Sequence, residues 1–430
     1  MEWRKYRLEN ISLSIQTGPF GSQLHQSDYS EKGTPVIMPK NMVEGKISES
    51  GIACVADIHV QRLKRYKVKI GDVIYSRRGD VGRCALIGEK EDGWLCGTGC
   101  LKVELDKEKV LAPFLFYILQ RQDSVGWVES HAVGSTMPNL NTGILAKLPV
   151  KIPEISVQHR IASILSAYDS LIENNTKRIR LLEKMAENLY KEWFVRFRFP
   201  GYEKAEFGDS KYGKLPNTFS IVRMNDVFNY YIGGGWGEEE QSDDFPKKAS
   251  VIRGADFPNV WHYDVSSCPC RFHKTKNYTA RQLKAGDIIM EISGGTSEQP
   301  VGRVVLVNRE LIDRFEDGRV ICASFCKLIR VNKEKVSPYY FYYWMKLLYN
   351  TRIIDKFQLQ STGIINFKFE SFLRKCDVML PPKEVMDTFE KQVATLHREM
   401  NLLAKQNTLL ARRRDLLLPR LMSGKLEVKP

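Results

Sequence analysis

Apolar side chains recur in alternating steps of three and four residues along one stretch in the middle of the chain. Nine of the ten positions on this stripe are apolar or aromatic, and no glycine or proline lies between Ser156 and Phe199. A period of 3.5 residues is typical of a helix that buries a narrow seam against another helix. At 1.5 Å per residue, the stretch predicts a rod of about 58 Å. The stripe comprises Ile161, Leu165, Tyr168, Ile172, Asn175, Ile179, Leu182, Ala186, Leu189 and Trp193.

A second stretch with the same period lies near the end of the chain and predicts the partner helix. It runs from Glu384 to about Leu418, where Pro419 and then Gly424 are expected to end it. Its stripe comprises Phe389, Val393, Leu396, Met400, Leu403, Asn407, Leu410, Arg414 and Leu417.

Each stripe contains one asparagine, Asn175 in the first and Asn407 in the second, at an offset of 232 residues. A lone asparagine in an apolar seam usually fixes register and partner choice at some loss of stability. An antiparallel coiled coil would place both side chains near its middle, where they could bond each other. The alternative is that each asparagine points into solvent where the seam drifts around the helix.

The rest of the chain consists of short β-rich runs bounded by glycine, aspartate and asparagine. A short helix is expected from Pro113 to Gln122, because proline is favoured at the first helical position. The segment after the first long helix is rich in glycine and charge and predicts an exposed linker. The predicted strands in the first part of the chain are residues 34–38, 67–76 and 84–88.

The two halves of the chain repeat each other. Lys-Ile-Gly-Asp-Val-Ile at 69–74 recurs as Lys-Ala-Gly-Asp-Ile-Ile at 284–289, and the Val-Gly-Arg segment 81–87 recurs at 301–307. We therefore predict an α+β fold in which two strand-rich domains are joined by two long helices in an antiparallel coiled coil, a pseudo-twofold internal repeat. The predicted segments are a first strand-rich domain 1–152, a helix 153–199, a linker 200–217, a second strand-rich domain 218–380, a helix 381–422 and a tail 423–430.

Composition narrows the class of partner. The chain of 430 residues is long enough for two or three domains, and its net charge of +14 favours a polyanionic partner. Its 9 cysteines are odd in number and scattered, which argues against a disulfide framework. No apolar run is long enough for a membrane span, and the first residues lack a signal-peptide core. We expect a cytoplasmic protein without membrane contact.

Two strand-rich repeats, each followed by a long helix, resemble the specificity (S) subunit of type I restriction–modification enzymes. The resemblance covers essentially the whole chain, and the order and duplication of its motifs make it specific. The motifs that carry it are Thr-Gly-Pro-Phe-Gly-Ser-Gln-Leu (17–24), Gly-Thr-Pro-Val-Ile-Met-Pro-Lys-Asn-Met (33–42), Ser-Arg-Arg-Gly-Asp-Val-Gly (76–82), the exit of the central helix (189–200) and the distal region 412–426.

This resemblance implies a non-catalytic subunit that reads DNA. Each strand-rich domain would be a target recognition domain that reads one half of a bipartite double-stranded target, and the helices would set the spacer. Two methyltransferase subunits would dock on the chain and carry S-adenosylmethionine, so this chain itself would bind no cofactor; restriction subunits would complete the complex. The loops of the two copies differ, as at 18–22 and 233–237, so we expect an asymmetric target.

The candidate DNA contacts are basic and amide side chains in loops after glycine-rich turns. Arginine suits bidentate contact with guanine, lysine suits phosphate, and asparagine can pair with adenine. For each residue the alternative is a solvated surface charge, and for Arg83 and Arg303, which recur in Val-Gly-Arg, a structural role. The candidates are Lys40, Asn41, Arg77, Arg78, Arg83, Arg253, Arg271, His273, Lys274, Lys276 and Arg303.

Three other motifs were weighed as sites. The segment 208–214 matches part of a phosphate-binding loop, but Leu215 stands where Ser or Thr should bind magnesium. Glycines 233–235 and 237 lack the setting of a dinucleotide fingerprint and predict a tight turn. Metal ligands are predicted to be absent, since one four-residue set has no common zinc spacing. That set is His262, Cys268, Cys270 and His273.

No amino-methyltransferase loop of the Asn-Pro-Pro-Tyr kind occurs in the sequence, and no convincing nuclease cluster surrounds Glu291. Catalysis is therefore expected to belong to partner subunits. Two rival interpretations stay open: an orphan specificity protein without active partners, and an enzyme with its own nucleotide or metal site near Gly208 or Cys268.

Overall fold

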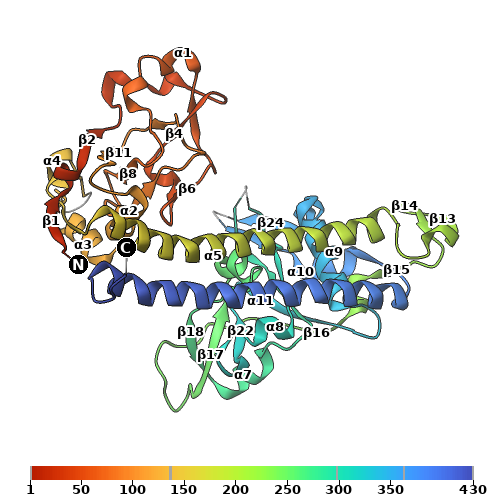
Figure 1. The fold of residues 1–430 in the computed structure, drawn as a ribbon. Coiled ribbons are helices and arrows are strands. Elements are labelled where there is room, and N and C mark those ends of the chain that lie inside the picture. Colours follow the sequence, from red (N-terminus) through yellow and green to blue (C-terminus); the bar gives the residue numbers. More distant parts are fainter. Residues whose placement is uncertain (1, 135–137, 297–298, 362–363, 429–430) are drawn as a thin grey trace. The chain divides into compact units, whose positions relative to one another are not determined.

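The computed structural model describes residues 2–134, 138–296, 299–361 and 364–428 (Figure 1). It divides into two compact units. Unit 1 is Met1–Leu171 with Leu410–Pro430, and unit 2 is Ile172–Leu409. The two long helices, α5 (Ile155–Tyr190) and α11 (Lys383–Met422), each contribute to both units. None of the helices in the described chain is long and apolar enough to cross a membrane.

Unit 1 is built on two small sheets, with strand orders β2-β11-β8-β9 and β10-β4-β7-β3, and a separate pair β1-β12. Strand β8 is buried along its whole length, which suits its run of Val, Ile and Tyr. The strands are β1 (Arg4–Arg7), β2 (Ser12–Thr17), β3 (Tyr29–Ser30), β4 (Thr34–Ile37), β5 (Met42–Val43), β6 (Lys46–Ile47), β7 (Ala53–Val55), β8 (Val73–Ser76), β9 (Cys84–Leu86), β10 (Leu95–Cys96), β11 (Cys100–Leu105) and β12 (Pro149–Ile152). The helices are α1 (Asp57–Val60), α2 (Ala112–Leu119), α3 (Gln122–His131) and α4 (Thr142–Ala146).

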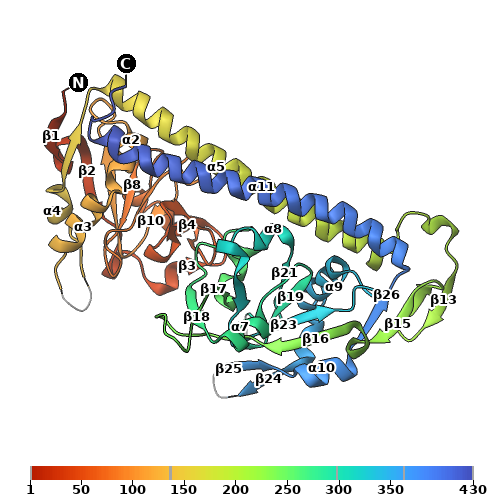
Figure 2. The same ribbon diagram turned by 90° about the horizontal axis from the view of Figure 1, so that it is seen from below.

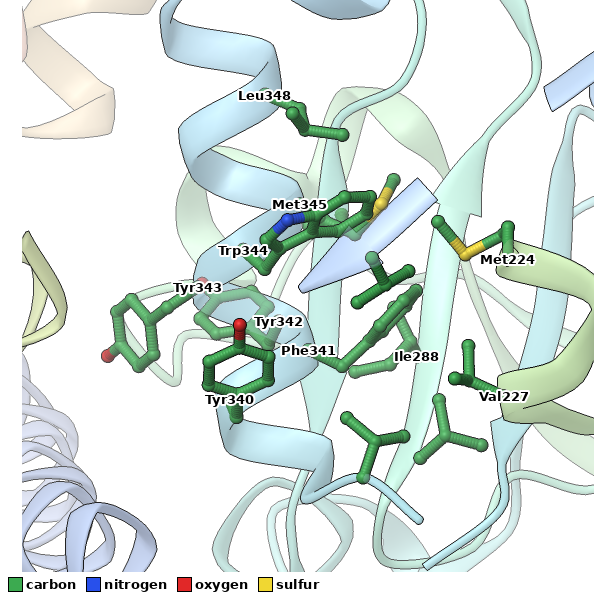
Figure 3. Close-up of a cluster of buried hydrophobic side chains, with 14 of the residues drawn as sticks. Met224, Val227, Ile288, Tyr340, Phe341, Tyr342, Tyr343, Trp344, Met345 and Leu348 are labelled. Atoms are coloured by element: carbon green, nitrogen blue, oxygen red, sulfur yellow. The ribbon is translucent and has the colours of Figure 1, made fainter. Parts of the chain in front are cut away.

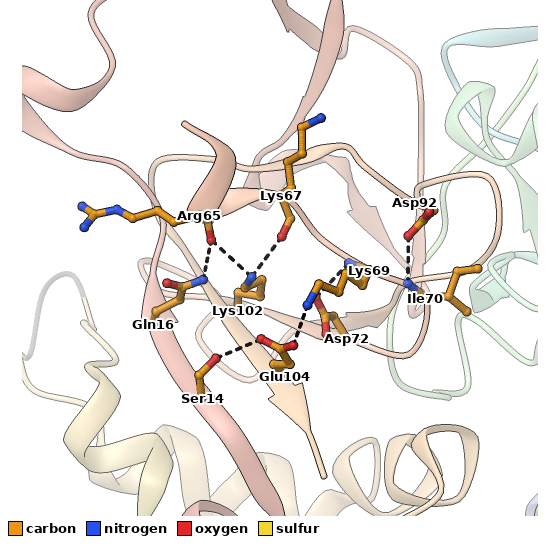
Figure 4. Close-up of polar contacts among 10 residues, drawn as sticks. All are labelled: Ser14, Gln16, Arg65, Lys67, Lys69, Ile70, Asp72, Asp92, Lys102 and Glu104. Carbon is orange, nitrogen blue, oxygen red and sulfur yellow. Dashed lines mark hydrogen bonds and ion pairs between the residues drawn. The ribbon is translucent and has the colours of Figure 1, made fainter. Parts of the chain in front are cut away.

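A buried lysine fastens the segment that leads into β8 (Figure 4). Lys102 of β11 is 4% exposed, and its Nζ donates to the backbone carbonyls of Arg65 and Lys67 at 3.3 and 2.9 Å. Gln16 of β2 donates to the same Arg65 carbonyl at 2.8 Å. Because a buried ammonium without partners would be strongly unfavourable, these carbonyls and the segment that carries them are held in place against the sheet.

Unit 2 repeats this plan. Its main sheet has the order β16-β23-β19-β21, and a second sheet has the order β18-β17-β22. The strands are β13 (Phe207–Ser210), β14 (Gly213–Pro216), β15 (Ser220–Arg223), β16 (Phe228–Gly233), β17 (Lys247–Ile252), β18 (Cys270–His273), β19 (Asp287–Glu291), β20 (Ser293–Gly295), β21 (Val304–Val307), β22 (Val320–Cys322), β23 (Cys326–Val331), β24 (Gln358–Ser361), β25 (Ile364–Phe367) and β26 (Asp377–Leu380). The helices are α6 (Phe257–Val260), α7 (Thr275–Arg281), α8 (Arg309–Ile312), α9 (Pro338–Asn350) and α10 (Phe369–Lys375).

The internal repeat extends to individual hydrogen bonds. In unit 1 the carboxylate of Asp72 accepts from the backbone N–H of Lys69 at 2.9 Å, and in unit 2 Asp287 accepts from Lys284 at 2.7 Å. The glycine before each aspartate has a positive φ, +94° and +97°, which side chains other than glycine rarely tolerate. The predicted duplication and the α+β class are therefore confirmed.

Helix α9 links the main sheet of unit 2 to the long helices (Figure 2). One face packs on the sheet, where Phe341 and Met345 lie in one core cluster with Ile288 of β19 (Figure 3). Tyr343 lies on another face, and its hydroxyl is 2.9 Å from Nε2 of His397 in α11. The helix therefore places the sheet and α11 in one continuous core.

A buried ion cluster adds a second link between α9 and α5. Nζ of Lys346 lies 2.7 Å from Oε1 of Glu183 and 2.6 Å from Oε1 of Glu187. Burial alone would lower the pKa of Lys346, but the two carboxylates raise it above its ordinary value, so the lysine stays charged. An ion pair of this kind is worth most as a positioning device.

Within unit 2 the two long helices run side by side and antiparallel (Figure 1). The predicted seam is confirmed there, since Ile179, Ala186, Phe389, Val393 and Met400 are all 3% exposed or less. The pairing begins again in unit 1, where Nη1 of Arg414 donates to Asp169 at 2.6 Å.

The two asparagines lie where the helices meet, but their bonding differs from the prediction. Asn175 is buried and donates to Oε1 of Gln406 at 3.3 Å, while Asn407 donates to Oγ1 of Thr176 at 3.2 Å. Each asparagine thus bonds the neighbour of the other across the described helix pair. The reciprocal bonds differ from a direct pair because the two side chains lie one position out of step.

Three element predictions need correction. The strand expected at 67–76 begins only at Val73, because the first residues form the turn around Asp72. The expected linker 200–217 contains a hairpin of β13 and β14. Helix α11 continues through Pro419 to Met422, because a proline in the last turn removes only one backbone donor.

A helix was also missed in unit 1. The prediction of one helix from Pro113 to Gln122 is replaced by α2, which ends at Leu119, and by α3, which starts at Gln122.

Candidate DNA interface

In unit 1, three of the predicted basic residues reach solvent around one loop. The backbone N–H of Arg77, directly after β8, donates to the carbonyl of Gly99 at 2.7 Å. This bond fixes the arginine beside an exposed aromatic ring, with its guanidinium carbon 6.0 Å from the centroid of Phe20. Arg78 and Lys40 are exposed. A cationic surface of this kind suits a phosphate backbone.

The other two candidates of unit 1 serve the protein itself. Asn41 is fully buried; its Oδ1 accepts from the N–H of Met38 at 3.1 Å and its Nδ2 donates to the carbonyl of Ser48 at 3.2 Å. Arg83 is bound to Asp80 and donates through Nη1 to the carbonyl of Met42 at 3.2 Å. Asn41 therefore presents no amide to a base edge in this structure, and Arg83 fastens the loop that holds it.

Unit 2 gathers its basic candidates on β18 and the start of α7. The guanidinium carbon of Arg271 lies 4.9 Å from the centroid of Trp236, and its Nη2 donates to Glu239 at 2.9 Å. Nζ of Lys274 lies 5.2 Å from the ring centroid of Phe245. Stacking of a cation on an aromatic face is worth about 0.5–1 kcal/mol at an exposed site. The two cations are thus pre-positioned at the surface.

Lys276 and His273 differ sharply in exposure. Lys276 is exposed on α7, whereas His273 is 4% exposed. Burial, together with the nearby positive charge of Arg281, lowers the pKa of His273 below its ordinary value, so its ring is neutral near pH 7. A buried neutral ring supports the β18 surface and supplies no charge to DNA.

Arg253 and Arg303 are held by carboxylates. Arg303 is 6% exposed; its Nε and Nη2 donate to Glu291 at 2.8 and 2.7 Å, and Nη2 also donates to the carbonyl of Gly254 at 2.8 Å. Arg253 donates to both carboxylate oxygens of Asp256 at 2.9 and 2.8 Å. Arg303 therefore has the structural role that its recurrence suggested, and Arg253 keeps only part of its fork free of protein contacts.

The weighed metal and nucleotide motifs are not built as sites in the described residues. His262 lies 3.3 Å from Glu183, and His273 is buried in β18. Among the described residues, no group of three or more His, Cys, Asp and Glu is placed to hold a metal ion. The segment 208–214 forms the β13–β14 hairpin, whereas a phosphate-binding loop would join a strand to a helix.

Comparisons with known proteins agree with this arrangement. Residues 2–184 match the family described as type I restriction modification DNA specificity domain. The putative type I restriction enzyme MjaX specificity subunit of Methanocaldococcus jannaschii is 23% identical over 443 residues, covering 100% of this chain and 94% of that protein. The HindI specificity subunit of Haemophilus influenzae is 22% identical over 478 residues, covering 99% and 100%.

A solved structure has the same fold. The crystal structure of the type I restriction–modification S subunit from M. genitalium matches with a TM-score of 0.58 at 15% identity, covering 98% of this chain and 96% of that one. The chain belongs to the specificity subunits of type I restriction–modification enzymes. Its role is DNA recognition within a restriction system.

Sequence reasoning missed two aromatic residues of this specificity subunit. Phe20 and Trp236 are 54% and 39% exposed and lie beside Arg77 and Arg271. The signal was present in the repeat: Gly-Pro-Phe-Gly at 18–21 aligns with Gly-Gly-Trp-Gly at 234–237. The two loops were expected to differ, because the comparison began one residue too early in the second copy.

Proposed function

We propose that this specificity subunit reads an asymmetric bipartite DNA target, one half with each unit. The carrying observation is that both units have one sheet plan with different exposed chemistry upon it. Unit 1 presents Arg77 and Arg78 beside Phe20, whereas unit 2 presents Arg271 and Lys274 beside Trp236. A shared frame with different contact groups supports two related readers with different preferences.

The proposed DNA contacts follow exposure. Side chains bound within the protein position the loops, since a group that is already bonded must lose those bonds before it can contact DNA. Asn41, His273 and Arg303 therefore support the surface, and Arg83 and Arg253 do so in part. The proposed direct contacts are Lys40, Arg77, Arg78, Arg271, Lys274 and Lys276.

The long helices are proposed to set the spacer and to dock two methyltransferase subunits. Leu402, Leu409 and Leu416 recur at seven-residue spacing on α11 and are 51%, 56% and 62% exposed. Leu181 and Met185 of α5 are 63% and 56% exposed. A repeated apolar stripe on the outside of a helix pair is typical of a surface that receives further helices.

We infer that the chemistry belongs to the partners. The methyltransferase subunits would bind S-adenosylmethionine and transfer its methyl group to adenine, and restriction subunits would join the same complex. What supports a non-catalytic role here is that the strongest titratable cluster of unit 2, around Lys346, is buried and internally paired. The rival interpretation, an orphan subunit, differs only in lacking active partners.

Methylation mapping tests this proposal. The chain is co-expressed with the methyltransferase subunit encoded beside it, and methylated bases in the host DNA are located by single-molecule sequencing. The expected result is N6-methyladenine in a motif of two unlike halves separated by a fixed spacer, with the methyltransferase co-purifying. Co-purification without a bipartite motif would contradict two-part reading, and failure to co-purify would favour the orphan.

A further inference from the structure

Two glycine loops, one in each unit, are pinned in the same way. The N–H of Gly18 donates to the carbonyl of Cys100 at 2.9 Å, and the N–H of Gly234 donates to that of Cys326 at 2.9 Å. A Cβ at Gly18 would lie 2.0 Å from the carbonyl oxygen of Gly97, and one at Gly234 would lie 2.1 Å from that of Ala323. Only glycine fits such an approach, so the two loops are equivalent.

Each pinned loop carries one aromatic ring two residues after that glycine. Phe20 is 54% exposed and Trp236 is 39% exposed. The next residue in each loop, Gly21 or Gly237, has a positive φ of +58° or +78°. The turn therefore ends identically in both units, and the close approach at its start leaves the ring no route into the core. Exposure of a large ring forfeits hydrophobic stabilisation, yet it occurs at the same point twice.

An arginine lies beside each ring, but it comes from a different element in each unit. Arg77 follows β8, and its counterpart in the repeat is Ile292; Arg271 lies on β18. The Nε of each arginine is buried and has no hydrogen-bond partner among the described residues. The pairing of aromatic and arginine has thus arisen at non-equivalent positions, which indicates that the pair itself serves the loop's purpose.

We propose that Phe20 and Trp236 are specificity-determining residues that insert against the bases of their half-sites, while Arg77 and Arg271 contact the phosphate beside the inserted ring. This inference rests on the proposed function and adds to it the residues and the manner of contact. An aromatic ring can stack on any base or wedge a base step open. A neighbouring guanidinium would neutralise the phosphate drawn close by the opened step.

Binding of DNA by the whole complex tests the inference. The probes are three duplexes: the bipartite target found by methylation mapping, and two versions in which one half is scrambled. The variants are Phe20→Ala and Trp236→Ala, with Phe20→Tyr and Trp236→Phe as conservative replacements. Leu13→Ala and Ile353→Ala are matched controls, because Leu13 in unit 1 and Ile353 in unit 2 are also exposed, at 66% and 44%. Each complex contains the co-expressed methyltransferase.

The expected result is a loss confined to one half per variant. Phe20→Ala should weaken binding of the intact target by roughly 5- to 100-fold, the range of alanine substitution at stacked bases, and should reduce the penalty for scrambling one half only. Trp236→Ala should do the same for the other half. Phe20→Tyr, Trp236→Phe and the two controls should retain binding, and thermal stability should stay unchanged because both rings are exposed.

The arginines have a separate signature. Arg77→Gln and Arg271→Gln should each lower the slope of log Kd against log salt by about 0.9, on scrambled and intact DNA alike, because a phosphate contact releases a counterion whatever the sequence. An unchanged slope would remove the arginines from the inference.

Several outcomes would overturn the role of the rings. Unchanged penalties, equal losses in both halves, or weaker co-purification of the methyltransferase would each do so, the last by assigning the rings to a protein contact. If the unsubstituted complex showed no penalty for scrambling either half, bipartite recognition itself would be wrong. The two failures are therefore distinguishable.

Discussion

His397 of α11 is a buried titratable side chain bonded on both sides. Its Nδ1 lies 2.7 Å from the hydroxyl of Tyr263 and its Nε2 lies 2.9 Å from that of Tyr343. Nδ2 of Asn308 donates to the Tyr263 hydroxyl at 2.6 Å. A neutral imidazole has one donor and one acceptor and satisfies both tyrosines. The histidine thus ties α11 to two separate segments of unit 2 without carrying charge.

Acid should loosen this link. Burial, followed by the positive charge of Lys346, lowers the pKa of His397 to about 4, although Glu183 opposes the shift. The unfolded state then binds the proton more readily, so stability is full above about pH 6.5 and falls as the pH drops towards 4. The expected loss is about 1.4 kcal/mol per pH unit within that window and about 3 kcal/mol in total.

Urea unfolding of the chain followed across this pH range measures the effect. His397→Gln, which cannot be protonated, should be less stable near neutral pH but should lose less stability on acidification. His159→Gln, at an exposed histidine of α5, should behave like the unsubstituted chain. A steep acid dependence that survives in His397→Gln would assign it to other groups.

Single residues show where sequence reasoning stops. Arg303 and Glu291 are both visible in the sequence, but their ion pair depends on the antiparallel register of β19 and β21, which no local pattern contains. Asn41 suggested adenine recognition by its type alone, and its burial is decided by contacts with Met38 and Ser48. Residue chemistry could be predicted; the partner that occupies each group could not.

At the scale of elements, the helix pair is the part that the sequence predicts best. A seam of 3.5-residue period depends only on local spacing, so the buried positions of α5 and α11 in unit 2 follow from the pattern. The one-residue offset between Asn175 and Asn407 does not, because a small axial shift alters which neighbours meet. The β13–β14 hairpin was missed for a related reason, since its glycines and charged residues are equally typical of linkers.

If the helices set the spacer, shortening both should shorten the target. Removing one heptad in phase from α5 and from the opposed part of α11 shortens each by about 10.5 Å, which corresponds to about three base pairs at 3.4 Å each. Methylation mapping should then find both half-sites unchanged with a shorter spacer. Removing the heptad from α5 alone should break the pairing and abolish methylation. Altered half-sites after the matched deletion would refute a spacer role.

The exposed leucines of α11 give a second prediction for this element. Leu402→Lys and Leu409→Lys should each weaken co-purification of the methyltransferase, because a buried leucine contributes about 1.5–3 kcal/mol to an interface. Thermal stability of the chain alone should change little, since both side chains are exposed. Leu13→Lys, at an exposed leucine of β2, is the matched control. Full retention of the methyltransferase in both variants would place docking elsewhere.

At the scale of the whole molecule, the repeat is what the sequence revealed most fully. Matched blocks in order predicted two copies of one sheet plan, because turn residues such as Asp72 and Asp287 are fixed by local geometry. The composition of unit 1 was beyond reach. Its core includes Leu421 and Met422 from the far end of the chain, and apolar residues after a helix do not announce which domain they join.

Exchange of one domain should therefore change one half of the target. Replacing residues 1–150 by the first domain of another specificity subunit is expected to alter one half-site in methylation mapping and leave the other intact. Because Leu410–Pro430 belongs to unit 1, a chimera that also takes this segment from the donor should be more stable than one that does not. A change in both half-sites would show that the units do not read DNA separately.

The discontinuity of unit 1 has a consequence for synthesis on the ribosome. Unit 2 is continuous and has all its residues once Leu409 has left the exit tunnel, whereas unit 1 lacks Leu421, Met422 and the segment around Gly424 that lies against Trp3. The first part of the chain to be translated is therefore the last that can close its core. Until termination, its apolar surface stays open to chaperones and proteases, and a message cut short near its 3′ end would yield a chain with one finished reader.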